Sequence, residues 1–269
     1  TTDPDTQMPP PESNSKLTPE QVQLLQRWVA EGAKYDQHWA FKPPVRHSLP
    51  TLTGAQRNWA QNAVDHFVAA KQAEVGLTPS PEAGRATLLR RVSLDLTGLP
   101  PTPDQLAAFV ADTEPQAYER AVDRLLQSSH YGERWGRHWL DAARYADSDG
   151  YSHDAARSIW PYRDWVIEAF NRDLPFDRFV VEQLAGDMLP EATLAQRIAT
   201  GFHRNTQINT EGGVDREQFR IDSIYDRIAT TGEVMFGLTF GCAQCHDHKY
   251  DPISQVEYYR LFAFFNNAD

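Results

Sequence analysis

Apolar side chains recur at spacings of three and four residues along most of this chain, which is the period of an amphipathic α-helix. The clearest stripe lies within residues 216–237 and consists of Ile221, Ile224, Ile228, Thr231 and Met235. Alternation with a period of two, which would indicate β-strands, does not occur over a useful length. The pattern therefore predicts a mainly α protein, an irregular multi-helix domain with long loops.

Helix start signals support this prediction at three places. The stretches "TPEQ" at 18–21 and "TPDQ" at 102–105 each combine a threonine cap, a first-turn proline and a glutamine that completes a capping box. The stretch "SQVE" at 254–257 forms a capping box before the last apolar stripe. We expect helices at 18–32, 55–76, 84–100, 102–112, 115–129, 131–146, 158–172, 176–185, 192–201, 216–237 and from 254 onward.

A proline-rich stretch, "HWAFKPPVRHSLP", interrupts the helical pattern after the first predicted helix. We interpret it as the start of a linker. The sequence thus predicts two parts, a short N-terminal piece with its linker at residues 1–42 and a large helical domain at residues 43–269.

Composition narrows the class of protein. The chain has 269 residues, 41% of them hydrophobic, and seven tryptophans, which is enough for a substantial core. Its net charge of −11 disfavours binding to nucleic acid or to anionic membranes, since both attract basic surfaces. No apolar run approaches the length of a membrane span, and the first residues do not have the pattern of a signal peptide. We expect the chain to be mature or a fragment, with the abrupt start favouring a fragment.

Both cysteines of the chain lie in one short motif, "CAQCH", formed by Cys242, Cys245 and His246. This is the C-x-x-C-H signature of haem c attachment. Two cysteines three positions apart on a helical turn can each bond one vinyl group of the macrocycle, and the adjacent histidine can coordinate the iron as proximal ligand. The motif therefore predicts one covalent haem c with its iron, surrounded by the helices and loops.

Two other kinds of site use similar residues. A zinc site could combine the two cysteines with His246 and His248, but four ligands within seven residues strain a tetrahedron. A thioredoxin-like pair would need a βαβ context, which the helical pattern lacks. Haem c explains the motif best. Because haem c is attached outside the cytoplasm, this hypothesis also predicts a periplasmic or otherwise exported protein.

The second axial ligand of the iron is open. His138 is a candidate because it shares a predicted helix face with Trp135, and the alternative is a histidine satisfied within the core. His203, at the end of a predicted helix, is an alternative distal ligand or a helix-terminal cation. Met235 fits core packing better than iron ligation, and Met188 is a loop methionine.

Further polar groups could serve the haem or the fold. His248 is too close in sequence to His246 to reach the opposite haem face, so we expect it beside a propionate or the iron ligand. Arg144 or Arg204 could neutralise propionates. The stretch "DSDGYSHD" is similar to part of a calcium loop, but a solvated turn explains it better because the full pattern is missing.

Several long motifs resemble the planctomycete cytochrome-associated domain family, the second of the cytochrome-type modules found in large exported planctomycete proteins and a domain of unknown function. The resemblance covers roughly residues 58–269 and implies haem and electron transfer. The motifs around His138, His203 and His248 all match the family pattern, so the resemblance does not choose the distal ligand. The motifs are "RHWLDAARYADSDGY", "WPYRDWVIEAFNRDLPFDRFVVEQLAGDMLP", "IATGFHRNTQINTEGGVD" and "DRIATTGEVMFGLTFGCAQCHDHKYDPISQVEYYRLFAFFNNAD".

The N-terminal piece fits the arrangement of that family, in which the module follows a cytochrome c module and precedes another large domain. The stretch "MPPPESNSKLTPEQVQLLQRWVAEGA" resembles the C-terminal tail of a cytochrome c domain. The resemblance implies that Met8 would be the distal ligand there, but the partner C-x-x-C-H is absent from this chain. A flexible terminus therefore explains Met8 better.

Together these observations predict a c-type cytochrome module that transfers electrons within a larger exported redox protein. Its expected partners are adjacent domains of the same polypeptide or a separate redox protein, rather than nucleic acid, and an electron-transfer role fits better than catalysis by this module alone. The alternatives are a haem-dependent oxidoreductase with an open distal iron site that acts on a small substrate, and a non-haem metal-binding interaction module.

Overall fold

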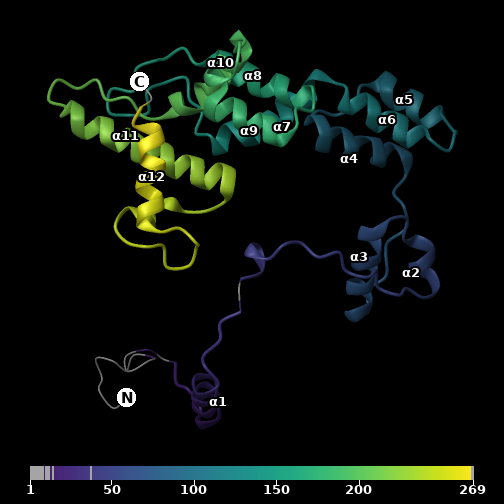
Figure 1. The fold of residues 1–269 in the computed structure, drawn as a ribbon. Coiled ribbons are helices and arrows are strands. Elements are labelled where there is room, and N and C mark those ends of the chain that lie inside the picture. The colour runs from purple at the N-terminus through teal and green to yellow at the C-terminus, as the bar shows by residue number, and fades with distance from the viewer. Residues whose placement is uncertain (1–8, 10–12, 14, 37, 268–269) are drawn as a thin grey trace. The chain divides into compact units, whose positions relative to one another are not determined.

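The computed structural model describes residues 9, 13, 15–36 and 38–267, and its chain divides into two compact units, Thr1–Pro81 and Glu82–Asp269 (Figure 1). The prediction of a mainly α protein is confirmed, since the described residues contain no strand and only an isolated antiparallel bridge between Ser148 and Ala156. Met8 lies outside the described residues. The boundary predicted after residue 42 separates an N-terminal tail from the helical domain, whereas the division after Pro81 separates compact units. The predicted boundary therefore stays a prediction.

The described residues of the first unit form three α-helices and one 3-10 turn. They are α1 Pro19–Ala30, η1 Trp39–Phe41, α2 Gly54–Trp59 and α3 Ala63–Glu74. The capping box predicted for α1 is present, with the Thr18 hydroxyl accepting from the Gln21 N–H and the Gln21 side chain accepting from the Thr18 N–H.

The second unit holds the remaining elements (Figure 1). They are α4 Arg85–Thr97, α5 Pro103–Ala111, α6 Ala117–Leu126, α7 Ser129–Ala142, α8 Trp160–Asn171, α9 Phe176–Ala185, η2 Gly186–Met188, α10 Leu194–Ala199, η3 Thr200–Asn205, α11 Arg216–Thr231, η4 Gly232–Phe236, η5 Phe240–Gln244 and α12 Gln255–Phe265. The boxes predicted for α5 and α12 are also present. The element η4 is a π-helical turn, so the stripe predicted for 216–237 changes its helical type before it ends.

One predicted helix was wrong. Residues 55–76 form two helices, α2 and α3, because Asn62 begins a new helix between them. The Asn62 side chain accepts hydrogen bonds from the Val64 and Asp65 N–H groups, and the Asp65 carboxylate accepts one from the Asn62 N–H. Such a capping box stabilises a helix start, so the chain turns here although its composition favours a continuous helix.

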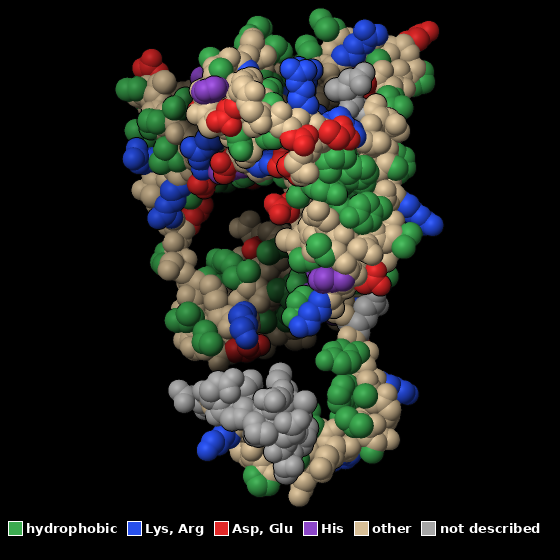
Figure 2. Space-filling view, turned by 90° about the vertical axis from the view of Figure 1, so that its left-hand side faces the viewer, with side chains coloured by type: hydrophobic (Ala, Val, Ile, Leu, Met, Phe, Trp, Pro, Cys, Tyr) green, Lys and Arg blue, Asp and Glu red, His purple; other side chains and the backbone are tan. Residues whose placement is uncertain are grey.

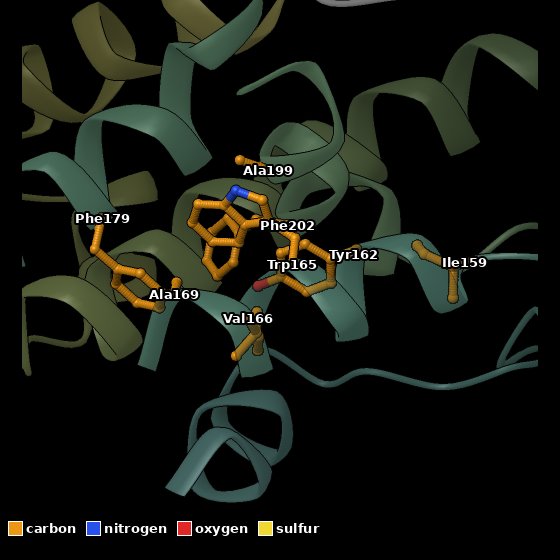
Figure 3. Packing of buried hydrophobic residues seen from close by; sticks show 9 residues of the cluster. Ile159, Tyr162, Trp165, Val166, Ala169, Phe179, Ala199 and Phe202 are labelled. Carbon is orange, nitrogen blue, oxygen red and sulfur yellow. The ribbon is translucent and has the colours of Figure 1, made fainter. Parts of the chain in front are cut away.

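The largest core cluster of the second unit is built on α8 and is rich in aromatic rings (Figure 3). Tyr162 and Trp165 extend from α8 on the side of Phe179 of α9 and Phe202 of η3, whereas Val166 points away from these two rings. Trp165 stacks on Phe179 with ring centroids 5.3 Å apart. Aromatic stacking of this kind adds to the burial of apolar area, so this cluster fixes the positions of α8, α9 and η3.

Close helix packing in this unit depends on a glycine. A Cβ atom placed on Gly132 of α7 would lie 2.2 Å from the Ile167 carbonyl oxygen of α8, so no larger residue fits there. The Gly132 N–H also donates to the Asn171 side chain at 2.7 Å. A Cβ atom on Gly136, one turn later, would make only ordinary van der Waals contacts, the nearest with the Ile167 side chain at 3.4 Å.

A second cluster joins α11, η5 and α12, and it supports the cysteine motif. Figure 1 shows α12 crossing α11, and the loop that precedes α12 lies below this crossing in that view. The buried members of this cluster are Ile224, Ile228, Phe240, Ala243, Tyr258 and Phe265. A third, smaller cluster, Leu89, Phe109, Ala117 and Ala121, holds α4, α5 and α6 together.

Surface chemistry is mixed. Acidic, basic and apolar side chains are interspersed over the face shown in Figure 2, and no single basic patch dominates that face. Large apolar side chains that remain exposed include Val256 and Phe264 of α12, with 61% and 77% of their surface accessible. Within the described part of the chain, no helix has the length and apolar character needed to cross a membrane.

Candidate functional site

The cysteine motif begins on η5, which ends at Gln244, and burial of neighbouring residues orients this turn. Phe240 and Ala243 face the cluster between α11 and α12, whereas Cys242 and Cys245 are exposed, unpaired thiols. Cys242 lies within this turn and Cys245 is the residue that ends it, so the two exposed thiols are three positions apart at one end of η5. Attachment of one ligand through both would require two accessible thiols of this kind.

His246 follows the second cysteine and is also exposed. Its Nδ1 atom lies 2.7 Å from the carbonyl oxygen of Asp247. Because a carbonyl oxygen only accepts, Nδ1 must carry the hydrogen, and this leaves Nε2 of the neutral ring with its lone pair free. A histidine that binds a metal commonly has this arrangement, with one nitrogen donating to a carbonyl and the other directed to the metal.

The first two turns of α12 make hydrogen bonds with the motif and with the residue that follows it. The carbonyl oxygen of Gln244, between the two cysteines, accepts from Gln255 Nε2 at 3.2 Å and from the Tyr259 hydroxyl at 3.1 Å. The Gln255 backbone N–H donates to the Asp247 carboxylate at 2.8 Å. Sequence reasoning missed these contacts. The capping box at Ser254 predicted where α12 begins, but not which of its residues reach the motif.

His248 organises the turn that follows the motif. Only 5% of its side chain is exposed, and its Nδ1 accepts hydrogen bonds from the N–H groups of Tyr250 and Asp251 at 3.2 and 2.8 Å. Its Nε2 lies 3.5 Å from the Asp251 carboxylate. Among the described residues, no three side chains of His, Cys, Asp or Glu converge to hold a metal ion. This geometry gives no support to a zinc site built from the motif.

His138 lies away from the cysteine motif. It is an exposed residue of α7, with its ring 5.7 Å from that of Trp135. The helix α7 packs mainly on α8 and α4, whereas η5 packs on α11 and α12. The structure therefore does not bring His138 together with His246, and its assignment as distal ligand stays a prediction.

His203 lies in a buried aromatic site. The centroid of its ring lies 5.3 Å from that of Phe202 and 5.1 Å from that of Phe265, and within the described part of the chain neither of its nitrogen atoms has a hydrogen-bond partner of normal geometry. The contact with Phe265 is at the last residue of α12, whereas Gln255, the first, contacts the cysteine motif. These two residues are about 15 Å apart along the axis, so the structure does not bring His203 and His246 together. Its role as the alternative distal ligand is still a prediction.

Burial lowers the pKa of His203 to about 4, and the positive charge of Arg227 acts in the same direction. The backbone of Leu184 and the carboxylate of Asp187 oppose this shift more weakly. A folded chain that keeps this ring neutral loses stability where the unfolded chain can bind the proton.

We therefore expect the free energy of unfolding to decrease as the pH is lowered from 6.5, the ordinary pKa of histidine, to about 4. The contribution of His203 to this loss is about 3 kcal/mol. Replacing His203 by phenylalanine keeps the ring contacts and removes the titrating group. Denaturant unfolding at several pH values should show a flatter profile for His203→Phe. Equal slopes for His203→Phe and the unchanged protein would contradict the expectation.

Several of the other candidates from the sequence are placed by the structure. Met235 packs against the core cluster on α8, as predicted, and Met188 is 80% exposed. Arg144 pairs with Asp226 through both of its terminal nitrogen atoms, so it is engaged within the fold. In the acidic stretch at 147–154, the Asp154 carboxylate accepts from the Gly150 N–H at 2.8 Å, which closes a turn.

Comparison with known proteins yields one match. The model of the family described as "PSCyt2: Protein of unknown function (DUF1549)" matches residues 63–269, which include the whole second unit and the cysteine motif. No curated protein and no solved structure matches the chain. Because the family model covers well over half of the sequence, this chain belongs to the PSCyt2 (DUF1549) family of proteins of unknown function.

Proposed function

We propose that this chain is a c-type cytochrome module with one haem c attached through Cys242 and Cys245 and with His246 as proximal iron ligand. It would transfer electrons to adjacent domains of a larger redox protein or to a partner protein. Because haem c is attached outside the cytoplasm, the proposal includes export to the periplasm or beyond.

One observation carries this proposal. Two exposed thiols lie three positions apart, one on the 3-10 turn η5 and one at the residue that ends it, and the histidine directly after them keeps Nε2 free while Nδ1 donates to the Asp247 carbonyl. This donor set fits haem c, which needs two accessible thiols and one oriented imidazole.

The roles of the chain's own residues follow from this geometry. Each thiol would form a thioether bond with one vinyl group, and His246 Nε2 would coordinate the iron. The Asp247 carbonyl would keep the imidazole in the required tautomer, and the Gln255 N–H would hold the Asp247 side chain. A bound haem supplies one-electron redox chemistry at its iron.

The proposal is tested by producing the chain, fused to a periplasmic export signal, in a bacterium that has a haem c attachment system. We expect an intact mass increased by one haem, resistance of that haem to acid-acetone extraction, and a sharp α band after reduction. A protein without a Soret band, made beside a known c-type cytochrome that is loaded normally, would overturn the proposal.

A second function, an oxidoreductase whose iron has an open distal side, is favoured by the placement of the candidate ligands. His138 lies on α7, and His203 lies on η3, where it contacts the last residue of α12. Neither is therefore placed beside His246. We expect the ferric protein to be high-spin and to change its spectrum when cyanide or imidazole is added. A low-spin spectrum that becomes high-spin in His138→Ala or His203→Ala would instead identify the distal ligand and favour electron transfer.

A further inference from the structure

One face of α12 is left uncovered next to the cysteine motif. It is lined by Gln255, Val256, Tyr259, Arg260 and Ala263, which we call the α12 face. These positions recur at spacings of three and four, so they share one side of the helix. The face borders an open hollow of about 440 Å³. Its two largest apolar side chains, Val256 and Tyr259, are 61% and 43% exposed.

The α12 face is joined directly to the motif. Gln255 and Tyr259, which line the hollow, are also the residues whose side chains donate to the Gln244 carbonyl between the two cysteines. Cys245 directly follows Gln244, so its backbone lies beside Tyr259, whose hydroxyl donates to the Gln244 carbonyl at 3.1 Å. A flat group bonded to Cys245 would therefore start at the edge of this face.

The α12 face also carries one positive charge, that of Arg260. Arg260 borders the hollow, and a guanidinium group pairs with carboxylates through two parallel hydrogen bonds. Glu257, an acidic residue near Arg260 on the same helix, accepts hydrogen bonds from Ser254 in the capping box. A haem has both features that this face would recognise, an apolar planar body and carboxylate groups.

We propose that the α12 face is the surface on which the covalently attached haem lies, with Val256, Tyr259 and Ala263 under the macrocycle and Arg260 beside a propionate. This inference rests on the proposed function. It adds what the motif alone does not specify, namely the side of the turn toward which the macrocycle extends. It also explains why Val256 and Tyr259 of α12 are left exposed, since a bound macrocycle would remove them from water.

The test compares two variants that introduce the same charge on the same helix. Val256→Glu places a carboxylate on the α12 face, whereas Phe264→Glu places one at an exposed position that does not line the hollow. Both proteins should retain covalent haem by intact mass, because the anchors are unchanged. We expect Val256→Glu to lose most of the Soret circular dichroism, which reports a haem held in a chiral surrounding, and Phe264→Glu to retain it.

A third variant tests the propionate contact. Arg260→Gln should make the midpoint potential of the haem depend more strongly on pH than in the unchanged protein, because the propionate would lose its cationic partner. If the unchanged protein carries covalent haem but Val256→Glu and Phe264→Glu have the same Soret dichroism, the α12 face is not the haem surface. Absence of covalent haem in the unchanged protein would overturn both this inference and the proposed function.

Discussion

Replacing Cys242 and Cys245 together by alanine is expected to abolish covalent haem attachment, and this is the largest effect that we predict. When both thiols are removed, no thioether bond can form, so any remaining haem would be held by His246 and surface contacts alone. Both side chains are exposed and make no disulfide, so the fold should persist. Intact mass after acid-acetone extraction measures the attachment, and far-UV circular dichroism monitors the helices.

The single variants and a neighbouring residue provide controls. Cys242→Ala and Cys245→Ala should each keep a haem on one bond, with a shifted α band. Lys249→Ala, an exposed residue of the same loop, should keep the full mass increase and an unchanged band. A double variant that still carried haem through extraction would show that the two thiols are not the attachment points.

Replacing Gly132 by alanine is expected to lower the free energy of unfolding by about 3 kcal/mol, the upper end of what overpacking usually costs. The added methyl group would lie 2.2 Å from the Ile167 carbonyl oxygen and 2.7 Å from the Asn171 side chain. Backbone cannot move aside as a flexible side chain can, so α7 and α8 would have to separate. Denaturant unfolding of the haem-free protein, followed by circular dichroism, measures the loss.

Gly136 offers a matched control one turn along the same helix. An alanine there would meet only ordinary contacts, the nearest being the Ile167 side chain at 3.4 Å. The gain in helix propensity over glycine, about 1 kcal/mol, should then prevail, so Gly136→Ala is expected to keep or raise stability. Equal destabilisation by both substitutions would indicate that helix–helix separation does not decide the effect of Gly132→Ala.

Local signals predicted much of the fold. Capping boxes at 18–21, 102–105 and 254–257 all form, because their hydrogen bonds join residues only three apart and need no distant partner. The same kind of signal at Asn62 was overlooked, and the predicted helix 55–76 was wrong for that reason. The predicted class, mainly α, follows from hydrophobic period alone and is confirmed.

The candidate site divides in a similar way. Spacing identified Cys242, Cys245 and His246 as a group, since residues that close in sequence are close in any fold. The histidines at 138 and 203 could not be placed relative to them, because that distance depends on how α7, η3 and α12 pack. The structure assigns His203 to an aromatic site at the end of α12 and leaves His138 exposed on α7.

What the sequence determined by itself was therefore the helical class, most helix starts and the presence of the C-x-x-C-H motif, all of which depend on residues close together in the chain. Tertiary packing decided which way the motif faces. Burial of Phe240 and Ala243 against α11 and α12 turns both thiols outward, and Gln255 and Tyr259 hold the carbonyl between them. Those contacts join segments that the chain brings together only when its apolar faces leave water.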